Sequence, residues 1–183
     1  GIDLTDKSVD INKVRQKIGM VFQQFNLFPN HTIKDNITLA PVKLGLMTKE
    51  EADKKAMELL ERVGLPEKAD SYPSMLSGGQ KQRVAVASAI TSERPLVLFD
   101  EPTSGLDLLH MRQVAKVVNQ VTDTGRTAVV VTHDPEFILR CCEFVLHLEN
   151  GQVQESYSIE DSDGRNRLLK FFLNDMEKEV SMK

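Results

Sequence analysis

Residues 95–107 read PLVLFDEPTSGLD, and this stretch decides the fold class. Its first half is a continuous apolar run, which is typical of a parallel strand covered on both faces. Asp100 and Glu101 follow at the carboxyl end, where α/β sheets bind ligands. Because successive strand side chains point to opposite faces, the two carboxylates can serve two tasks. One can hold Mg²⁺ while the other orients an attacking water, although an isolated acidic pair is commonly just solvated.

Two further apolar runs indicate neighbouring strands. They are IGMVF at residues 18–22 and TAVVV at residues 127–131. Residues 108–124 lie between two of the strands, and their apolar side chains recur at helical spacing. A strand, a helix and a strand form the crossover unit of an α/β fold, so we expect a mostly parallel sheet. The apolar positions of this helix are Met111, Val114, Val118 and Val121, and Gly125 ends it.

A second motif, MLSGGQKQRVAVASAI, occupies residues 75–90. Ser77, Gly78 and Gly79 come directly before a stretch that reads as a helix. A helix N-terminus exposes unpaired backbone N–H groups and the positive end of the helix dipole. The motif therefore predicts that an anion such as a phosphate binds in front of this helix.

The other segments read as helices and one hairpin. Residues 48–63 predict an amphipathic helix that begins with a capping box at Thr48 and Glu51. A short helix is expected at residues 9–17, and Asp134 caps another. The apolar stripe of the 48–63 helix consists of Ala52, Ala56, Leu59, Leu60 and Val63, followed by Gly64.

We expect one partial catalytic domain over residues 1–183, with a helical subdomain at about residues 32–74 and a C-terminal hairpin and helix at about residues 143–180. Asn150-Gly151 is typical of a hairpin turn. The last helix is predicted to start near Gly164. Its expected apolar side comprises Leu169, Phe172, Leu173, Met176 and Val180.

The composition is that of a globular protein, with 183 residues of which 40% are hydrophobic. The net charge of −4 gives no support for charge-driven binding to nucleic acid. Cys141 and Cys142 are adjacent, so we expect small buried side chains rather than a disulfide. No apolar run reaches the length of a membrane span.

Two polar residues end predicted strands and are further candidates. His133 follows the 127–131 strand, where a ring N–H can contact a phosphate, although such a histidine is more often structural. Gln23 follows the 18–22 strand and can contact water or a metal-bound ligand, although a single glutamine is commonly just surface.

In this order, the motifs resemble those of the ATP-binding cassette (ABC) ATPases over essentially the whole chain. The resemblance implies a P-loop NTPase-like core that uses ATP and Mg²⁺ and works as a dimer of two cassettes. The helix that begins after Ser77 would then hold the γ-phosphate of an ATP bound to the opposite subunit. The resemblance implies that Asp100 is the Walker B metal ligand, Glu101 the catalytic carboxylate and His133 the switch histidine. It makes Gln23 the Q-loop glutamine, which also lies near the metal, and Ser77, Gly78, Gly79 and Gln80 the signature motif. Ser104 to Asp107 would be the D-loop, with Ser104 and Asp107 near the nucleotide.

The chain departs from this family at one place. The phosphate loop G-x-x-x-x-G-K-[ST] does not occur in the sequence, and residues 1–4 resemble a hairpin that follows that loop in the family. We therefore expect the first strand and phosphate loop to be missing by truncation or by nature. The chain alone is expected to bind ATP weakly and not to hydrolyse it.

Three classes of ABC protein remain possible: a transporter motor, a soluble repair or translation protein, and a silent partner or fragment. The compact segment of residues 24–75 has no heptads, which argues against the repair class and favours transport. Such a subunit needs a membrane permease partner and would sit at the cytoplasmic face of the membrane. Phe25, Leu27 and Phe28 either contact that partner or pack inside the helical subdomain.

The solute is indicated differently by the two halves of the chain. Residues 18–32 resemble the cassettes of polar amino-acid importers. The later segments SGLDLLHMRQVAKVV and THDPEFILRCCEFVLHLENG resemble energy-coupling-factor cassettes, which import vitamins and metal ions. An amino-acid importer is the preferred interpretation, and the vitamin or metal-ion importer is the alternative.

Overall fold

The computed structural model describes residues 6, 8–22, 25–91 and 93–181, the last eight of these by their backbone only. The chain divides into two compact units, Gly1–Thr132 and His133–Lys183, which are described separately below. Gln23 and residues 1–4 lie outside the described residues.

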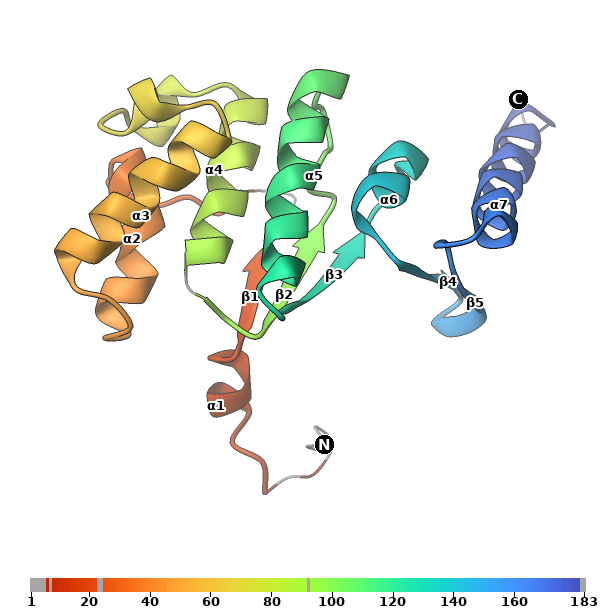
Figure 1. The fold of residues 1–183 in the computed structure, drawn as a ribbon, viewed down its shortest axis with the longest axis horizontal. Helices are drawn as coiled ribbons and strands as arrows, with labels where there is room; N and C mark the ends of the chain where they lie inside the picture. Colours follow the sequence, from red (N-terminus) through yellow and green to blue (C-terminus); the bar gives the residue numbers. More distant parts are fainter. Residues whose placement is uncertain (1–5, 7, 23–24, 92, 182–183) are drawn as a thin grey trace. The chain divides into compact units, whose positions relative to one another are not determined.

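A parallel sheet forms the centre of the first unit (Figure 1). Its strands are β1 (Ile18–Val21), β2 (Leu96–Asp100) and β3 (Thr127–Val131), in the order β1-β2-β3. The register pairs Met20 with Leu98 and Leu98 with Val129. This arrangement confirms the predicted α/β class and the parallel sheet.

Helices α4 (Gly78–Thr91) and α5 (Leu108–Asp123) run side by side along this sheet (Figure 1). They bury the face that carries Val97 and Phe99, both 0% exposed. A Cβ on Gly19 of β1 would lie 3.5 Å from the carbonyl oxygen of Ala89 in α4, which places α4 on that face. The chain enters α5 through its N-cap Asp107.

The opposite face of the sheet was expected to be covered too, and this prediction is wrong for the described residues. Met20 is 43% exposed, Val129 43% and Val131 59%. Every second residue of β3 is exposed, since the described helices of this unit pack against one face only. A continuous apolar run therefore does not show by itself that both faces are covered within this chain.

Two further helices of the first unit pack beside α4: α2 (Ile33–Lys43) and α3 (Lys49–Arg62). The predicted capping box of α3 is confirmed, since the Thr48 N–H donates to Glu51 Oε2 at 2.8 Å and the Glu51 N–H donates to Thr48 Oγ1 at 3.3 Å. The predicted apolar stripe is buried throughout. Gly64 follows with a φ of 69°, which favours glycine at the end of a helix.

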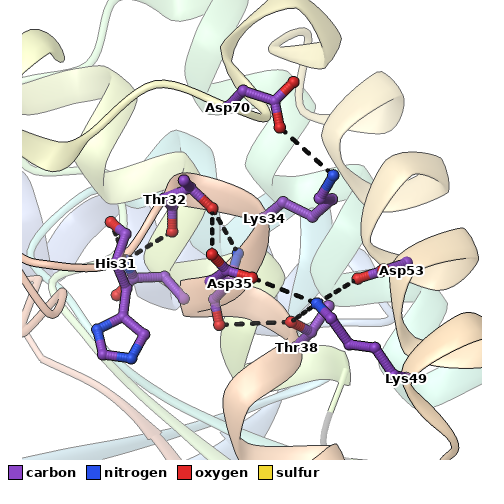
Figure 2. Close-up of polar contacts among 9 residues, drawn as sticks. His31, Thr32, Lys34, Asp35, Thr38, Lys49, Asp53 and Asp70 are labelled. Carbon is purple, nitrogen blue, oxygen red and sulfur yellow. Dashed lines mark hydrogen bonds and ion pairs between the residues drawn. The ribbon is translucent and has the colours of Figure 1, made fainter.

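The N-termini of α2 and α3 are joined by polar contacts (Figure 2). Lys49 Nζ lies 3.2 Å from Asp35 Oδ1, 2.7 Å from Asp53 Oδ1 and 3.3 Å from Thr38 Oγ1. The Thr32 hydroxyl donates to Asp35 Oδ2 at 2.8 Å. The Thr32 hydroxyl, and then Lys49, hold the pKa of Asp35 below its ordinary value. These exposed contacts set the relative position of the two helix starts and add little stability.

The smaller elements of the first unit are α1 (Ile11–Arg15), η1 (Pro66–Lys68) and η2 (Pro73–Met75). The α1 helix is shorter than the predicted 9–17 segment because Asp10 caps it and Gln16 ends it. The helical subdomain at residues 32–74 remains a prediction, since the observed division into two units falls elsewhere.

The second unit contains α6 (Pro135–Cys141), β4 (Phe144–Glu149), β5 (Gln152–Ser158) and α7 (Ser162–Ser181). The strands form the predicted antiparallel hairpin, and its turn has positive φ at Asn150 (51°) and Gly151 (75°). Both cysteines are free thiols, and they are half-buried rather than buried as predicted. The buried core comprises Ile138, Tyr157, Ile159 and Leu168.

The apolar side predicted for the last helix is wrong in part. Leu169 is 44% exposed and Leu173 is 61% exposed, whereas Leu168 is fully buried and Phe172 packs against the core. The close approach of Gly164 to β5 explains the rotation, since a Cβ there would lie 1.8 Å from the Ser158 carbonyl oxygen. Met176 and Val180 lie outside the described side chains.

Candidate functional site

Asp100 and Glu101 occupy the carboxyl end of β2, as the sequence predicts. Both are half-buried. Strand alternation puts Asp100 on the same face as Leu98, which is the face that the described helices leave open. Asp100 therefore presents its carboxylate on a side of the sheet that a ligand can approach.

The backbone of Glu101 turns sharply away from the strand. Its φ is 48°, in the left-handed region that side chains other than glycine rarely adopt. Its N–H donates to the Val131 carbonyl at 2.9 Å, and its carbonyl accepts from the Ser104 N–H at 3.2 Å. The same carbonyl also accepts from Gln82 Nε2 at 3.1 Å. Several bonds therefore hold the peptide that carries the Glu101 side chain.

The segment after Glu101 is a tight turn that ends in the cap of α5. Ser104 is exposed. Asp107 accepts from the His110 N–H at 2.9 Å and contacts the His110 ring at 2.8 Å. These contacts, the backbone bond first, hold the pKa of Asp107 below its ordinary value. Asp107 thus has a structural role as a helix cap, and its contact with a nucleotide remains a prediction, as does that of Ser104.

The N-terminus of α4 is closed by a second reciprocal cap. The Ser77 N–H donates to Gln80 Oε1 at 2.9 Å, and the Gln80 N–H donates to Ser77 Oγ at 3.3 Å. The first turn contains no acidic residue. Apart from its chain neighbours and the backbone of its own helix, no described atom lies within 4 Å of a Cβ built on Gly78. The positive end of this helix is therefore exposed and uncompensated, which suits an anion.

Gly79 is required by a different contact. A Cβ on Gly79 would lie 2.9 Å from Leu106 Cδ2. Leu106 belongs to the turn between Glu101 and Asp107, so that turn lies directly against the start of α4. The structure thus brings together two motifs that lie about twenty positions apart in the sequence.

These residues fit the ligands that the family resemblance implies. The open space beside Gly78 at the start of α4 can admit the oxygens of a phosphate. Mg²⁺ keeps several water ligands and needs only one or two carboxylates, so Asp100 suffices as a protein ligand. No cluster of three or more His, Cys, Asp or Glu side chains that could hold a metal occurs in the described part of the chain.

Two predicted residues are not tested by this geometry. Gln23 lies outside the described residues, so its role remains a prediction. His133 is exposed and is the first residue of the second unit. Its role therefore rests on its place in the sequence after β3.

Two long polar side chains of α4, which the sequence patterns do not single out, are buried. Gln82 is 1% exposed and Arg83 is 6% exposed. Arg83 Nη1 donates to the Val63 carbonyl at 2.5 Å and to Gln113 Oε1 at 3.3 Å, which joins the end of α3 to α5. Burial lowers the pKa of the Arg83 guanidinium. The available signal was two polar residues inside an otherwise small, apolar helix, but burial cannot be read from that pattern.

An open groove of about 390 Å³ lies beside β1, α2 and α4. Phe25 and Phe28 line it, together with Asn36. Asn36 is 4% exposed, accepts from the Phe28 N–H at 2.7 Å and donates to the Thr32 carbonyl at 2.9 Å. Phe28 is 53% exposed, so this loop is fixed by its polar contacts while its ring remains accessible. The rest of the lining includes Met20, Ser88 and Arg94.

Among the described residues, no helix has the length and apolar character that a membrane span requires.

Comparison with known proteins identifies the family. The sequence pattern of the ABC transporter family matches residues 1–104. The glutamine transport ATP-binding protein GlnQ of Geobacillus stearothermophilus is 43% identical over 94% of this chain and 72% of its own length. The glutamate transport ATP-binding protein GluA of Corynebacterium efficiens is 47% identical over 87% of this chain, which spans only 64% of that protein.

A solved structure agrees with the sequence comparison. It is that of the ATP-binding cassette MJ0796, described as a dimer in a post-hydrolysis state with bound ADP and Pi. The similarity has a TM-score of 0.74 and 36% identity, and it covers 86% of this chain and 69% of that one. The predicted resemblance is confirmed: this chain belongs to the ABC transporter family of ATP-binding proteins.

Proposed function

We propose that this chain is part of the ATP-binding subunit of a transporter that imports a polar amino acid such as glutamine or glutamate. The observation that carries the proposal is the exposed, uncompensated start of α4 beside the Glu101 turn. The GlnQ relative covers 94% of the chain, so it spans both halves whose patterns indicated different solutes. This favours amino acids over the vitamin or metal-ion alternative.

The proposed roles follow from chemistry and position. ATP supplies the phosphoryl group whose transfer to water releases the energy for transport. Asp100 offers a carboxylate to Mg²⁺, and Glu101 orients the attacking water. Gln23 and His133 are proposed to contact the metal-bound ligands and the terminal phosphate. Ser77, Gly78, Gly79 and Gln80 are proposed to bind the phosphate held by a second cassette, with Ser104 and Asp107 at the same interface.

The partners follow from the same arrangement. The exposed start of α4 is proposed to bind a phosphate held by a second ATPase subunit, and the MJ0796 cassette is described as a dimer. The groove lined by Phe25 and Phe28 is the proposed contact with a membrane permease. The subunit would then lie on the cytoplasmic face of the membrane through that permease.

The test of this function uses the full-length protein with Glu101→Gln. We expect ATP hydrolysis to fall by about 100-fold or more, since the amide cannot accept a proton from water, while ATP binding persists. Glu61→Gln, an exposed change on α3, is the matched control and should leave turnover unchanged. Undiminished hydrolysis in Glu101→Gln would contradict the proposed role.

A second test uses the 183-residue chain by itself. Its 183 residues contain no phosphate loop, so we propose that it binds ATP with a dissociation constant above about 1 mM by itself. Isothermal titration of Mg-ATP into the purified chain measures this directly. Micromolar binding would show that these 183 residues suffice for a nucleotide site.

A further inference from the structure

Gln82 is buried in α4 and makes one directed contact. Its side chain is 1% exposed, and Nε2 donates to the Glu101 carbonyl at 3.1 Å. Its Oε1 has no hydrogen-bond partner among the residues that the structure describes. Exchanging the two amide atoms would place oxygen against the Glu101 oxygen, so the contact itself fixes the orientation of the amide.

Burying the Gln82 amide oxygen without a partner lowers the stability of the fold, so the residue is better explained by the hydrogen bond that its N–H group donates. The donor acts on a residue whose backbone is itself unfavourable, since Glu101 has a φ of 48°. The Val131 carbonyl and the Ser104 N–H also bond the backbone of this residue. Gln82 adds a side-chain contact from α4 to the same backbone.

The same helix carries the exposed cap at its start. Ser77 and Gln82 are separated by about one and a half turns of α4. A second link runs in parallel, because Leu106 packs where a Cβ of Gly79 would lie. A displacement of the α4 N-terminus thus reaches the Glu101 peptide through one hydrogen bond and one close packing contact.

From this geometry we infer that Gln82 is a positioning residue, which couples the phosphate-facing start of α4 to the backbone of Glu101. The inference rests on the proposed function, in which Glu101 orients water. Under it, an anion that binds in front of Ser77 changes the aim of the Glu101 carboxylate in the same subunit. Binding of nucleotide at one site of the dimer would then affect the position of the catalytic carboxylate at the other site.

Three variants separate this role from a general effect on folding. Gln82→Met keeps the length and burial of the side chain but removes the donor. Gln82→Glu places a carboxylate oxygen against the Glu101 carbonyl. Thr91→Val is the matched control, because Thr91 is also fully buried in α4 and its hydroxyl donates at 2.8 Å to Ala87 of the same helix.

In the full-length protein we expect Gln82→Met to lower kcat about tenfold with an unchanged KM for ATP. Gln82→Glu should lower kcat further, and Thr91→Val should stay within about twofold of wild type. A kcat of Gln82→Met within about twofold of wild type would overturn the inference, and so would an equal loss in Thr91→Val. Glu101→Gln is measured beside them: if it retains turnover, the proposed function fails rather than the role of Gln82.

A measurement on the unaltered chain covers the case in which a variant does not fold. The side-chain amide protons of Gln82 should exchange with solvent at least about tenfold more slowly than those of the half-buried Gln80, as seen by NMR. Exchange as fast as that of Gln80 would mean that the contact with Glu101 is not maintained, and would overturn the inference without any substitution.

Discussion

Helices α3 and α4 begin with the same kind of reciprocal cap, but the two helix starts have different proposed roles. Thr48 with Glu51 and Ser77 with Gln80 are both reciprocal caps. The first turn of α3 then carries Glu50 and Glu51, whereas the first turn of α4 has no acidic residue. The acids offset the partial positive charge at the start of α3, whereas the partial positive charge at the start of α4 remains available to an anionic ligand.

The two helices also differ along their length. One stripe of α3 is buried and the rest faces solvent. In α4 nearly every residue from position 82 to 91 is buried, including Gln82, Arg83 and Thr91. A helix that is buried on most sides can transmit a displacement at its start to several neighbours, whereas an amphipathic helix at the periphery mainly contributes stability.

The largest expected effect tests the structural half of this comparison. Leu60 in α3 is 0% exposed, so Leu60→Ala should lower the free energy of unfolding by about 3 kcal/mol through lost burial and a cavity. Chemical denaturation measures the change. A loss below about 1 kcal/mol would mean that α3 is not packed as described.

The next prediction changes the charge at the two helix starts, and the expected changes in the free energy of unfolding have opposite signs. Gly78→Asp adds an acid at the start of α4 and replaces a glycine, so it should raise the free energy of unfolding by about 1 kcal/mol. Glu50→Gln removes an acid from the start of α3 and should lower it by about 0.5 kcal/mol. Thermal denaturation at low salt compares each of the two variants with the wild type. A destabilised Gly78→Asp would show that the start of α4 is less open than the contacts indicate.

Removing the caps should cost the same stability in both helices. Ser77→Ala and Thr48→Ala are each expected to lower the free energy of unfolding by about 1 kcal/mol, because each loses a side-chain acceptor for the first turn. Only Ser77→Ala should also weaken ATP-dependent association of the full-length protein. Equal effects of both variants on association would remove the functional difference between the caps.

The smallest effect is a pH dependence at the α2–α3 contact. Because the pKa of Asp35 lies below its ordinary value of 3.8, its contribution is present above that value and is lost as pH falls through the lowered pKa. The contacts are exposed, so the contribution is about 0.5 kcal/mol. The difference in Tm between wild type and Asp35→Asn should be constant near neutral pH and shrink below about pH 4. A difference that grows on acidification would contradict this sign.

Much of the fold could be predicted from local patterns. The strands, the Thr48 capping box, the stripe from Ala52 to Val63 and the Asn150 turn depend on residues close in sequence, and all are confirmed. The open face of β3 could not be predicted, since apolar runs look alike whether one or both faces are covered. The rotation of α7 onto Leu168 follows from the contact of Gly164 with Ser158, which no helical periodicity contains.

The candidate site shows the same division. Asp100, Glu101 and the 77–80 motif were recognised because residue type and order carry their chemistry. Gln82, Arg83 and Asn36 were not, because long polar side chains usually lie on the surface and only the packing of distant segments buries these three. Their partners, Glu101, Val63 and Phe28, lie 8 to 20 positions away.

The most direct test of the central claim is the ATP-dependent dimerisation of the full-length protein carrying Glu101→Gln, measured by sedimentation. With Mg-ATP, this protein is predicted to form dimers, because each α4 start binds a phosphate held by the other subunit. Adding Gly78→Asp should abolish the dimers, since a carboxylate then occupies the anion position. Dimers that persist in the double variant would show that the start of α4 does not bind the partner's nucleotide, and would contradict the account.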